Sequence, residues 1–175
     1  MSQIKVNSIV PAGGLPAGAN GGIIQVVNTI KTDVFTTDQS SSGDETEITG
    51  LNATITPSSN ANKILISVVL NSGNHGTTYG FFIKRGTTTV DALRGDAASS
   101  RKRVTAATGI PQDTNQMTSC SCMVLDSPAT TSAITYKIFV KSDAGTFRLN
   151  RSSQDQDNNT GSRTVSSITL MEVSV

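Results

Sequence analysis

The sequence contains no tryptophan, and aromatic residues make up only 4% of its 175 residues. Charged residues are also few, at 15%, and they nearly cancel to a formal net charge of +1. A nearly neutral chain has no overall field to draw it to nucleic acid or to an anionic membrane. The shortage of aromatic rings also argues against a free-standing carbohydrate-binding module, because such modules typically bind sugars on exposed aromatic side chains.

Residues that carry catalysis are scarce as well. Histidine occurs once, at His75, and the two cysteines, Cys120 and Cys122, lie two positions apart on a predicted strand. That spacing places both thiols on one face, where we expect them to be buried as small apolar groups. The sequence has no nucleophile elbow, phosphate-binding loop, dinucleotide fingerprint or cysteine–histidine metal cluster. We therefore expect a protein that is not an enzyme and that binds no cofactor.

Long apolar runs are missing too. No segment approaches the roughly 20 apolar residues that a transmembrane helix needs, and Pro11 interrupts the first ten residues. We therefore expect no membrane insertion and no secretory signal. Hydrophobic residues make up 35% of the chain, which is little for a self-sufficient core, so we expect other subunits to supply further burial.

What the sequence does contain is period-two alternation, which is typical of strands with one buried face. It is clearest over residues 119–141, where apolar residues share one parity on each side of Asp126-Ser127-Pro128, so we predict a hairpin of two strands joined by a turn. Further strands are predicted at residues 23–27, 34–35, 48–55, 63–70, 79–84, 87–90, 104–110, 147–149 and 164–175.

Short strands separated by turns rich in Gly, Pro and Asn predict an all-β fold, an antiparallel β-sandwich of jelly-roll type over residues 23–175. The run 23–27 is apolar on both parities, so both of its faces should be covered. Gly50 should kink the strand around it. The last strand changes parity near Met171, which indicates a bulge, or burial on both faces as at a subunit interface.

Residues 1–22 differ from the rest of the chain because they are dominated by Gly, Pro and Ala. Such a stretch cannot bury enough apolar surface to order itself. We interpret it as an extended N-terminal arm that is held by another protein, or alternatively is folded back on its own domain. Its larger apolar residues are Ile4, Val6, Ile9, Val10 and Leu15.

Two loops carry charged residues of interest. The run Asp155-Gln156-Asp157 matches the first ligand positions of a calcium loop, but Thr160 replaces the turn glycine and Ser166 the bidentate glutamate. A looser calcium site and an ordinary solvated turn both stay open. The basic run Arg101-Lys102-Arg103 has no interleaved aromatic residues, so it favours a solvated or inter-subunit patch over a nucleic-acid site.

Three stretches resemble a family of small phage virion proteins, which are tail fibre or structural proteins of marine bacteriophages and cyanophages. They are residues 4–10 (IKVNSIV) with the linker behind them, residues 95–101 (GDAASSR) and residues 125–137 (LDSPATTSAITYK). Residues 150–152 and 168–173 are also similar to that family's closing strands.

The resemblance implies a β-sandwich head that forms a homotrimer and is fixed to the virion through residues 1–22. The apolar arm residues Ile4, Val6, Ile9, Val10 and Leu15 would then contact other phage virion proteins. The resemblance brings no catalytic residue and no cofactor. The implied function is a short fibre that presents its head for host adsorption. The alternative is a capsid decoration or cement protein that stabilises the capsid without binding the host.

Loops on a rigid scaffold commonly carry binding residues, and we predict the receptor-facing loops at 71–78, 94–103 and 154–162. A trimer would multiply weak contacts with a repetitive host cell-surface glycan. The candidate receptor-facing residues are Asn74, His75, Arg94, Asp96, Arg101, Lys102, Asp155, Asp157 and Asn158.

Overall fold

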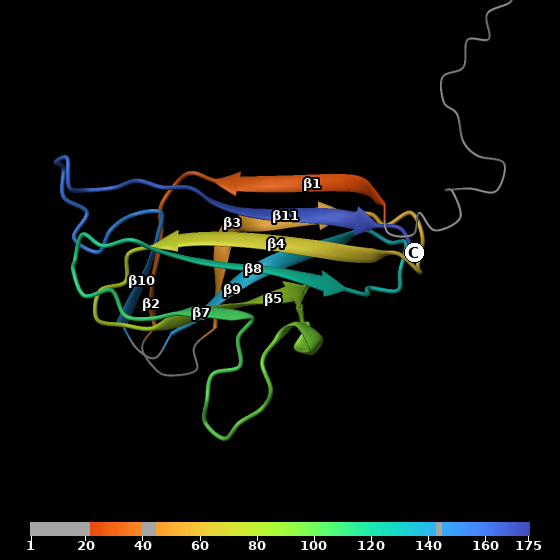
Figure 1. Cartoon of the computed structure of the whole chain (residues 1–175), viewed down its shortest axis with the longest axis horizontal. Helices are drawn as coiled ribbons and strands as arrows, with labels where there is room; N and C mark the ends of the chain where they lie inside the picture. Colours follow the sequence, from red (N-terminus) through yellow and green to blue (C-terminus); the bar gives the residue numbers. More distant parts are fainter. Residues whose placement is uncertain (1–21, 40–44, 143–144) are drawn as a thin grey trace, which may run out of the picture.

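The computed structural model describes residues 22–39, 45–142 and 145–175, which form two antiparallel sheets packed face to face (Figure 1). The predicted all-β sandwich is therefore confirmed. Sheet A consists of β1 (Ile23–Lys31), β11 (Ser166–Val173), β4 (Lys63–Ser72), β8 (Thr118–Asp126), β10 (Gly145–Leu149) and β2 (Phe35–Gln39). Sheet B consists of β3 (Thr46–Ile55), β9 (Ile134–Ser142), β5 (Tyr79–Arg85), β6 (Thr88–Thr89) and β7 (Ala106–Thr108).

The strand order differs from the order along the chain. In sheet A, β11 lies between β1 and β4, β8 pairs with the other side of β4, and the pair β10–β2 joins at the end of β4. In sheet B the order is β3-β9-β5, with β6 and β7 both paired to β5. The jelly-roll arrangement stays a prediction. The helical turn η1 (Asp91–Leu93) is three residues long, and the described ranges contain no helix with the length and apolar character to cross a membrane.

The core lies between the two sheets and is built from alternating side chains. Every second side chain of β4 points inward, because successive side chains of a strand face opposite sides. Most of the few aromatic residues lie here, and the rings of Phe147 on β10 and Tyr79 on β5 pack edge to face at a centroid distance of 4.9 Å. The inward residues of β4 are fully buried: Ile64, Ile66, Val68 and Leu70.

The predicted hairpin over residues 119–141 is wrong. Both of its strands form, as β8 and β9, but β8 pairs with β4 in sheet A whereas β9 pairs with β3 and β5 in sheet B. Asp126 ends β8 with a buried carboxylate that accepts a hydrogen bond from the Tyr136 hydroxyl on β9. The connection over residues 127–133 therefore crosses from one sheet to the other.

Two local predictions are confirmed. Gly50 has a φ of +80°, and the register of β3 against β9 shifts between Glu47 and Asn52, so the strand is kinked at the glycine. Cys120 is buried and Cys122 packs against the core from the same face of β8, as small apolar residues would.

The parity change predicted for the last strand has a different cause. β11 keeps one inward parity along its whole length, because Glu172 occupies an inward position and is buried. The register shift lies instead in its partner β1, between Ile23 and Gln25. The bulge predicted for residues 164–175 is therefore in the neighbouring strand.

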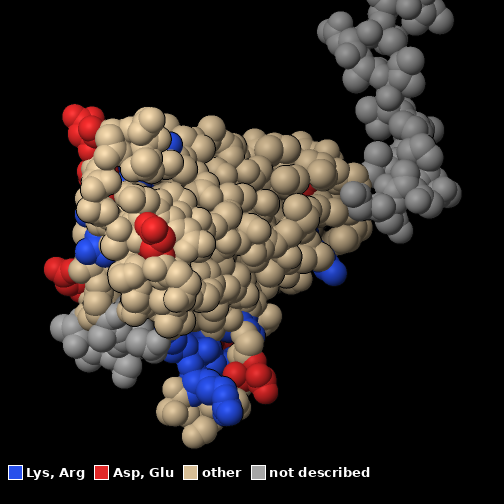
Figure 2. Space-filling model, turned by 60° about the vertical axis from the view of Figure 1, so that its left-hand side comes forward, with Lys and Arg blue, Asp and Glu red and all other residues tan. Residues whose placement is uncertain are grey.

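The prediction that both faces of residues 23–27 are covered is wrong for the single chain. Ile24 and Val26 point outward from β1 and are exposed. Sheet A is the nearer layer in Figure 1, and the turned view in Figure 2 still faces its outer side obliquely. In that view the charged side chains gather at one end and around one projecting loop, and the broad surface between them is nearly free of charge.

The described chain begins and ends at the same end of the sandwich. The Gly22 carbonyl oxygen accepts a hydrogen bond of 3.0 Å from the Ser174 backbone N–H. β4 runs from this end to the opposite one, and β11 runs back, so loops 71–78 and 154–162 lie at the end opposite Gly22 (Figure 1). The predicted attachment residues of the arm lie outside the described residues: Ile4, Val6, Ile9, Val10 and Leu15.

Candidate binding loops

The three candidate loops occupy two places on the molecule. Loops 71–78 and 154–162 share the end opposite Gly22, whereas loop 94–103 projects from the side of the sandwich between η1 and β7 (Figure 1). The segments that carry the first two loops are in direct contact, because a Cβ added at Gly73 would come within 2.5 Å of the Ser152 Cα. The fold thus brings two of the three predicted loops together.

Asn74 does not fit the prediction that it faces a receptor, because its side chain is fully buried. Its Oδ1 accepts the Arg148 backbone N–H at 2.6 Å, and its Nδ2 donates to the Ser72 Oγ at 3.0 Å. The Ser72 hydroxyl donates in turn to the Tyr79 hydroxyl, and burial raises the pKa of Tyr79 to about 12. Asn74 therefore fixes this loop against the core, and His75 is left exposed beside it.

A Gly73→Ala substitution should destabilise this end of the molecule. The added Cβ would meet the Arg151 carbonyl oxygen at 2.6 Å and the Ser152 Cα at 2.5 Å, and both are backbone atoms that cannot rotate away. We expect a loss of about 1 to 3 kcal/mol in the free energy of unfolding, measured by urea denaturation. Gly109→Ala is the matched control, because its Cβ would meet nothing within 4 Å. Equal losses for the two variants would show that the close approach is not the cause.

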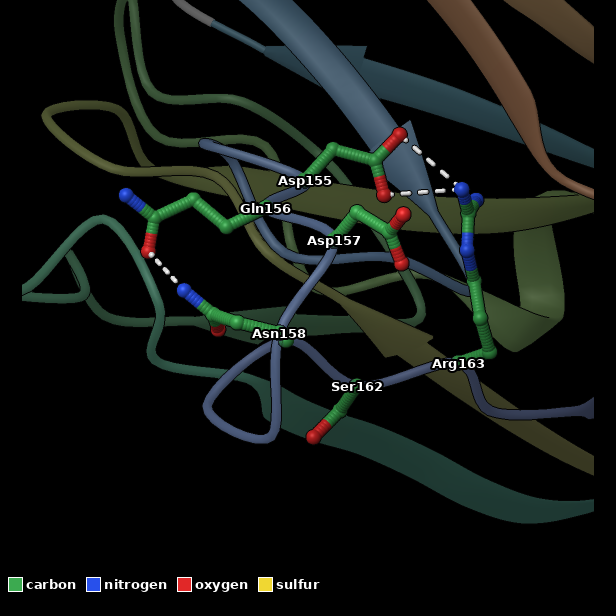
Figure 3. A pocket seen from close by; sticks show the side chains of 7 residues that line it. Asp155, Gln156, Asp157, Asn158, Ser162 and Arg163 are labelled. Carbon is green, nitrogen blue, oxygen red and sulfur yellow. Dashed lines mark hydrogen bonds and ion pairs between the residues drawn. The ribbon is translucent and has the colours of Figure 1, made fainter.

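Two arginines hold Asp155 in loop 154–162. The Asp155 Oδ1 lies 2.9 Å from the Arg163 Nη2, and its Oδ2 lies 3.1 Å from the Arg151 Nη1. Figure 3 shows the pair of Asp155 and Arg163. The Asp155 backbone has a positive φ of 54°, and its N–H donates to the Ser152 Oγ at 3.1 Å. Asp155 therefore orders the loop through contacts within the chain.

The same loop surrounds an open cavity of about 260 Å³, lined by residues 155–158 and 161–163 (Figure 3). Asn158 closes the turn by accepting the Thr160 backbone N–H on its Oδ1 at 3.0 Å. Asp157 lines the cavity and is exposed. Of the three candidate residues in this loop, Asp157 is thus the one whose charged group is best placed to meet a ligand.

The contacts favour the solvated turn over the calcium site. Two guanidinium groups already neutralise the Asp155 carboxylate, and a calcium ion would have to displace them. Within residues 22–39, 45–142 and 145–175, no three His, Cys, Asp or Glu side chains gather in a way that could hold a metal ion.

Loop 94–103 presents the basic run on a projection, which is blue at the bottom of Figure 2. Arg94 forms an ion pair with Asp91, and its guanidinium carbon lies 5.6 Å from the centroid of the Phe82 ring. These contacts hold Arg94 against the body of the protein, whereas Asp96 and Arg101 are exposed. The four candidate residues of this loop thus differ in their availability.

A second cavity, of about 480 Å³, lies between this loop and the start of β5. The Lys102 Nζ at its border donates to the Thr78 Oγ1 at 3.4 Å, so the basic run is linked to the end of loop 71–78. Cations beside hydroxyl groups suit an anionic or hydroxyl-rich ligand. The polar side chains around the cavity are those of Thr78, Ser100, Arg101, Lys102 and Thr108.

Sequence reasoning missed the contribution of the segment before β8. The Gln154 backbone N–H donates to the Thr114 carbonyl oxygen at 3.1 Å, and the Thr114 hydroxyl donates to the Gln154 Oε1 at 2.8 Å. These bonds add residues 109–117 to the loops at this end. The polar composition of the segment indicates a loop, but no local pattern indicates which other loop it contacts.

The cysteines offer no reactive thiol at neutral pH. Burial raises the pKa of Cys120 and of Cys122 to about 11, which keeps both thiols protonated.

A comparison with protein-family models and a search of curated proteins both find no match for this sequence. A function must therefore be inferred from the chemistry of the loops and from the sequence resemblance described above.

Proposed function

We propose that this chain is a bacteriophage virion protein without enzymatic activity. It forms a short homotrimeric fibre that is attached through its N-terminal arm and adsorbs to the host through its β-sandwich head. The resemblance of residues 4–10, 95–101 and 125–137 to small phage virion proteins supports this class. Its partners are further copies of the chain, other virion proteins at residues 1–22, and a host cell-surface glycan.

The observation that carries the proposal is the separation of the two ends of the sandwich. Residues 1–21 join the head at Gly22, which is hydrogen-bonded to Ser174. Loops 71–78 and 154–162 lie at the opposite end (Figure 1). A fibre needs this separation, because one end must hold the particle while the other stays accessible to the host.

The chemistry of the loops supports a glycan as the receptor. The cavity beside loop 94–103 combines the cations Arg101 and Lys102 with threonine and serine hydroxyls, which suit the hydroxyl and carboxylate groups of sugars. One such open site would bind weakly. Three copies on one fibre raise the overall affinity through effective concentration.

Gold-labelled antibody against the head, viewed on intact virions by electron microscopy, tests the location. Gold at the tail or neck supports the fibre. Gold spread over the capsid would support the decoration or cement protein instead, and virions without gold would contradict both functions.

Purified full-length protein should compete with the phage that encodes it for host cells and so slow adsorption. His75→Ala combined with Asp157→Ala should weaken this competition by at least about tenfold, because both side chains are exposed on the loops opposite Gly22. The measurement is the rate of phage adsorption at increasing concentrations of protein.

Ser127→Ala combined with Thr131→Ala is the matched control, since both side chains are exposed on the connection between β8 and β9 near Gly22. Equal competition by the two double variants would contradict a receptor role for His75 and Asp157. No competition by the unchanged protein would contradict adsorption itself.

A further inference from the structure

The outer face of sheet A is a nearly uncharged surface, crossed by apolar side chains, that the described chain leaves exposed. It is formed by β1, β11, β4 and β8, whose inward side chains build the core and whose alternate side chains point to solvent. Five apolar side chains on this face are between 46% and 63% exposed: Ile24, Val26, Ile30, Met123 and Leu125.

Strand register lines the apolar side chains up across the sheet. Val26 on β1 lies opposite Met171 on β11. Met171 lies opposite Leu65 on β4, which in turn lies opposite Leu125 on β8. One continuous apolar row therefore crosses all four strands.

Charge is nearly absent from the same face. The outward positions of the four strands carry one charged residue, Lys63, at the start of β4. Beside the apolar row the face is polar but uncharged, and the Asn28 Nδ2 donates to the Thr169 Oγ1 at 2.7 Å. The remaining charged residues of these strands are buried: Lys31, Asp126 and Glu172.

We propose that a second copy of this chain packs against this face, so that the outer side of sheet A is the interface between subunits. An uncharged face is complementary to itself, because two copies bring no like charges together. A protein partner selected by charge would find little to pair with here. The largest apolar patch on a protein surface is often a functional one.

The size of the face fits this occupant. Four strands about 4.8 Å apart and eight residues of about 3.3 Å each give a face of roughly 500 Å². Three such faces turned toward a common axis would remove roughly 1,500 Å² from water in total, which is comparable to the area buried in a standard protein–protein interface. The inference rests on the homotrimer of the proposed function and names the surface that joins its copies.

Sedimentation velocity of the full-length protein tests the interface. The unchanged protein should sediment as an oligomer, and Val26→Lys combined with Leu125→Lys should weaken association by at least about tenfold, because each lysine would be desolvated without a partner. The matched control is Ile110→Lys combined with Val34→Lys. These side chains are 47% and 42% exposed but lie outside the four strands, so this variant should associate like the unchanged protein.

Three outcomes would overturn the interface: a monomeric unchanged protein, an unaffected Val26→Lys–Leu125→Lys variant, or equal dissociation of both double variants. Circular dichroism separates dissociation from unfolding. If the lysine variant does not fold, Val26→Ser combined with Leu125→Ser replaces it, with the same expectation of weaker association. Gold labelling measures the location on the virion independently of the oligomeric state. If virions are labelled at the tail but the purified protein is monomeric, this interface is overturned while the adsorption role is not.

Discussion

Replacing Asp126 by alanine should lower the free energy of unfolding by about 2 to 4 kcal/mol. The Asp126 carboxylate is 5% exposed and joins the two sheets. Its Oδ2 accepts the Tyr136 hydroxyl at 2.5 Å, and its Oδ1 accepts the Arg85 Nη2 at 3.2 Å. The alanine variant would leave the buried Tyr136 hydroxyl without its acceptor and would remove the ion pair of Arg85, whose Nη1 still donates to the Pro128 carbonyl oxygen at 3.4 Å. Urea denaturation followed by circular dichroism measures the loss.

Two further variants separate the contributions. Tyr136→Phe removes one hydrogen bond to a charged group and should cost about 1.5 to 3 kcal/mol. Combining it with Asp126→Ala should cost less than the sum of the single effects, because both changes remove the same bond. Ser127→Ala is the control, because Ser127 follows Asp126 in the chain and its side chain is exposed. An Asp126→Ala variant as stable as Ser127→Ala would show that the bridge does not stabilise the fold.

Replacing Glu172 by glutamine should lower the free energy of unfolding at neutral pH by about 2 to 3 kcal/mol. It should also make that free energy less dependent on pH in the acidic range. The Glu172 carboxylate is buried, and its Oε1 accepts the Ser58 backbone N–H at 2.6 Å, the Ser58 hydroxyl at 2.7 Å and the Asn62 Nδ2 at 2.6 Å. Burial alone would raise the pKa of Glu172, but the hydrogen bonds from Asn62 and Ser58 outweigh it and lower the pKa below its ordinary value of 4.5.

A lowered pKa fixes the direction of the pH dependence. The unfolded chain binds a proton at Glu172 more readily than the folded chain, so this stabilisation is present above about pH 4.5 and is lost as the pH falls through the folded-state pKa. Between about pH 7 and pH 3, the free energy of unfolding measured by urea denaturation should therefore fall more steeply for the unchanged protein than for Glu172→Gln. Exposed carboxylates such as Asp33 titrate equally in both proteins and cancel in the comparison. Parallel curves would contradict the role of Glu172.

The sequence predicts the strands well because alternation depends only on neighbours two residues apart. Strand pairing depends on contacts far along the chain, which leave no local signal. β8 and β9 were therefore predicted to pair as neighbours, although Asp126 reaches from sheet A to Tyr136 in sheet B. Glu172 is the reason for the wrong prediction of a parity change in the last strand. An acidic residue at an inward position interrupts the apolar alternation, although the strand itself stays regular.

The candidate loops show the same limit. Composition located the polar segments, and the acidic and basic residues within them. It did not predict that Asn74 is buried, because asparagine is an ordinary turn residue and the Arg148 N–H that holds it comes from β10. Nor did it predict that Asp155 meets Arg151 and Arg163, since ion pairs depend on the path of the loop. Availability to a ligand is thus decided by tertiary contacts.

The position of β11 has a consequence for the order of events during synthesis. β1 and β4 leave the ribosome long before the strand that joins them, so sheet A cannot close until Ser166–Val173 has emerged. Pairing over such a separation makes folding slow. The apolar row also needs Met171 from β11. Nascent chains therefore lack the proposed interface, and each head completes its fold before copies can recognise one another.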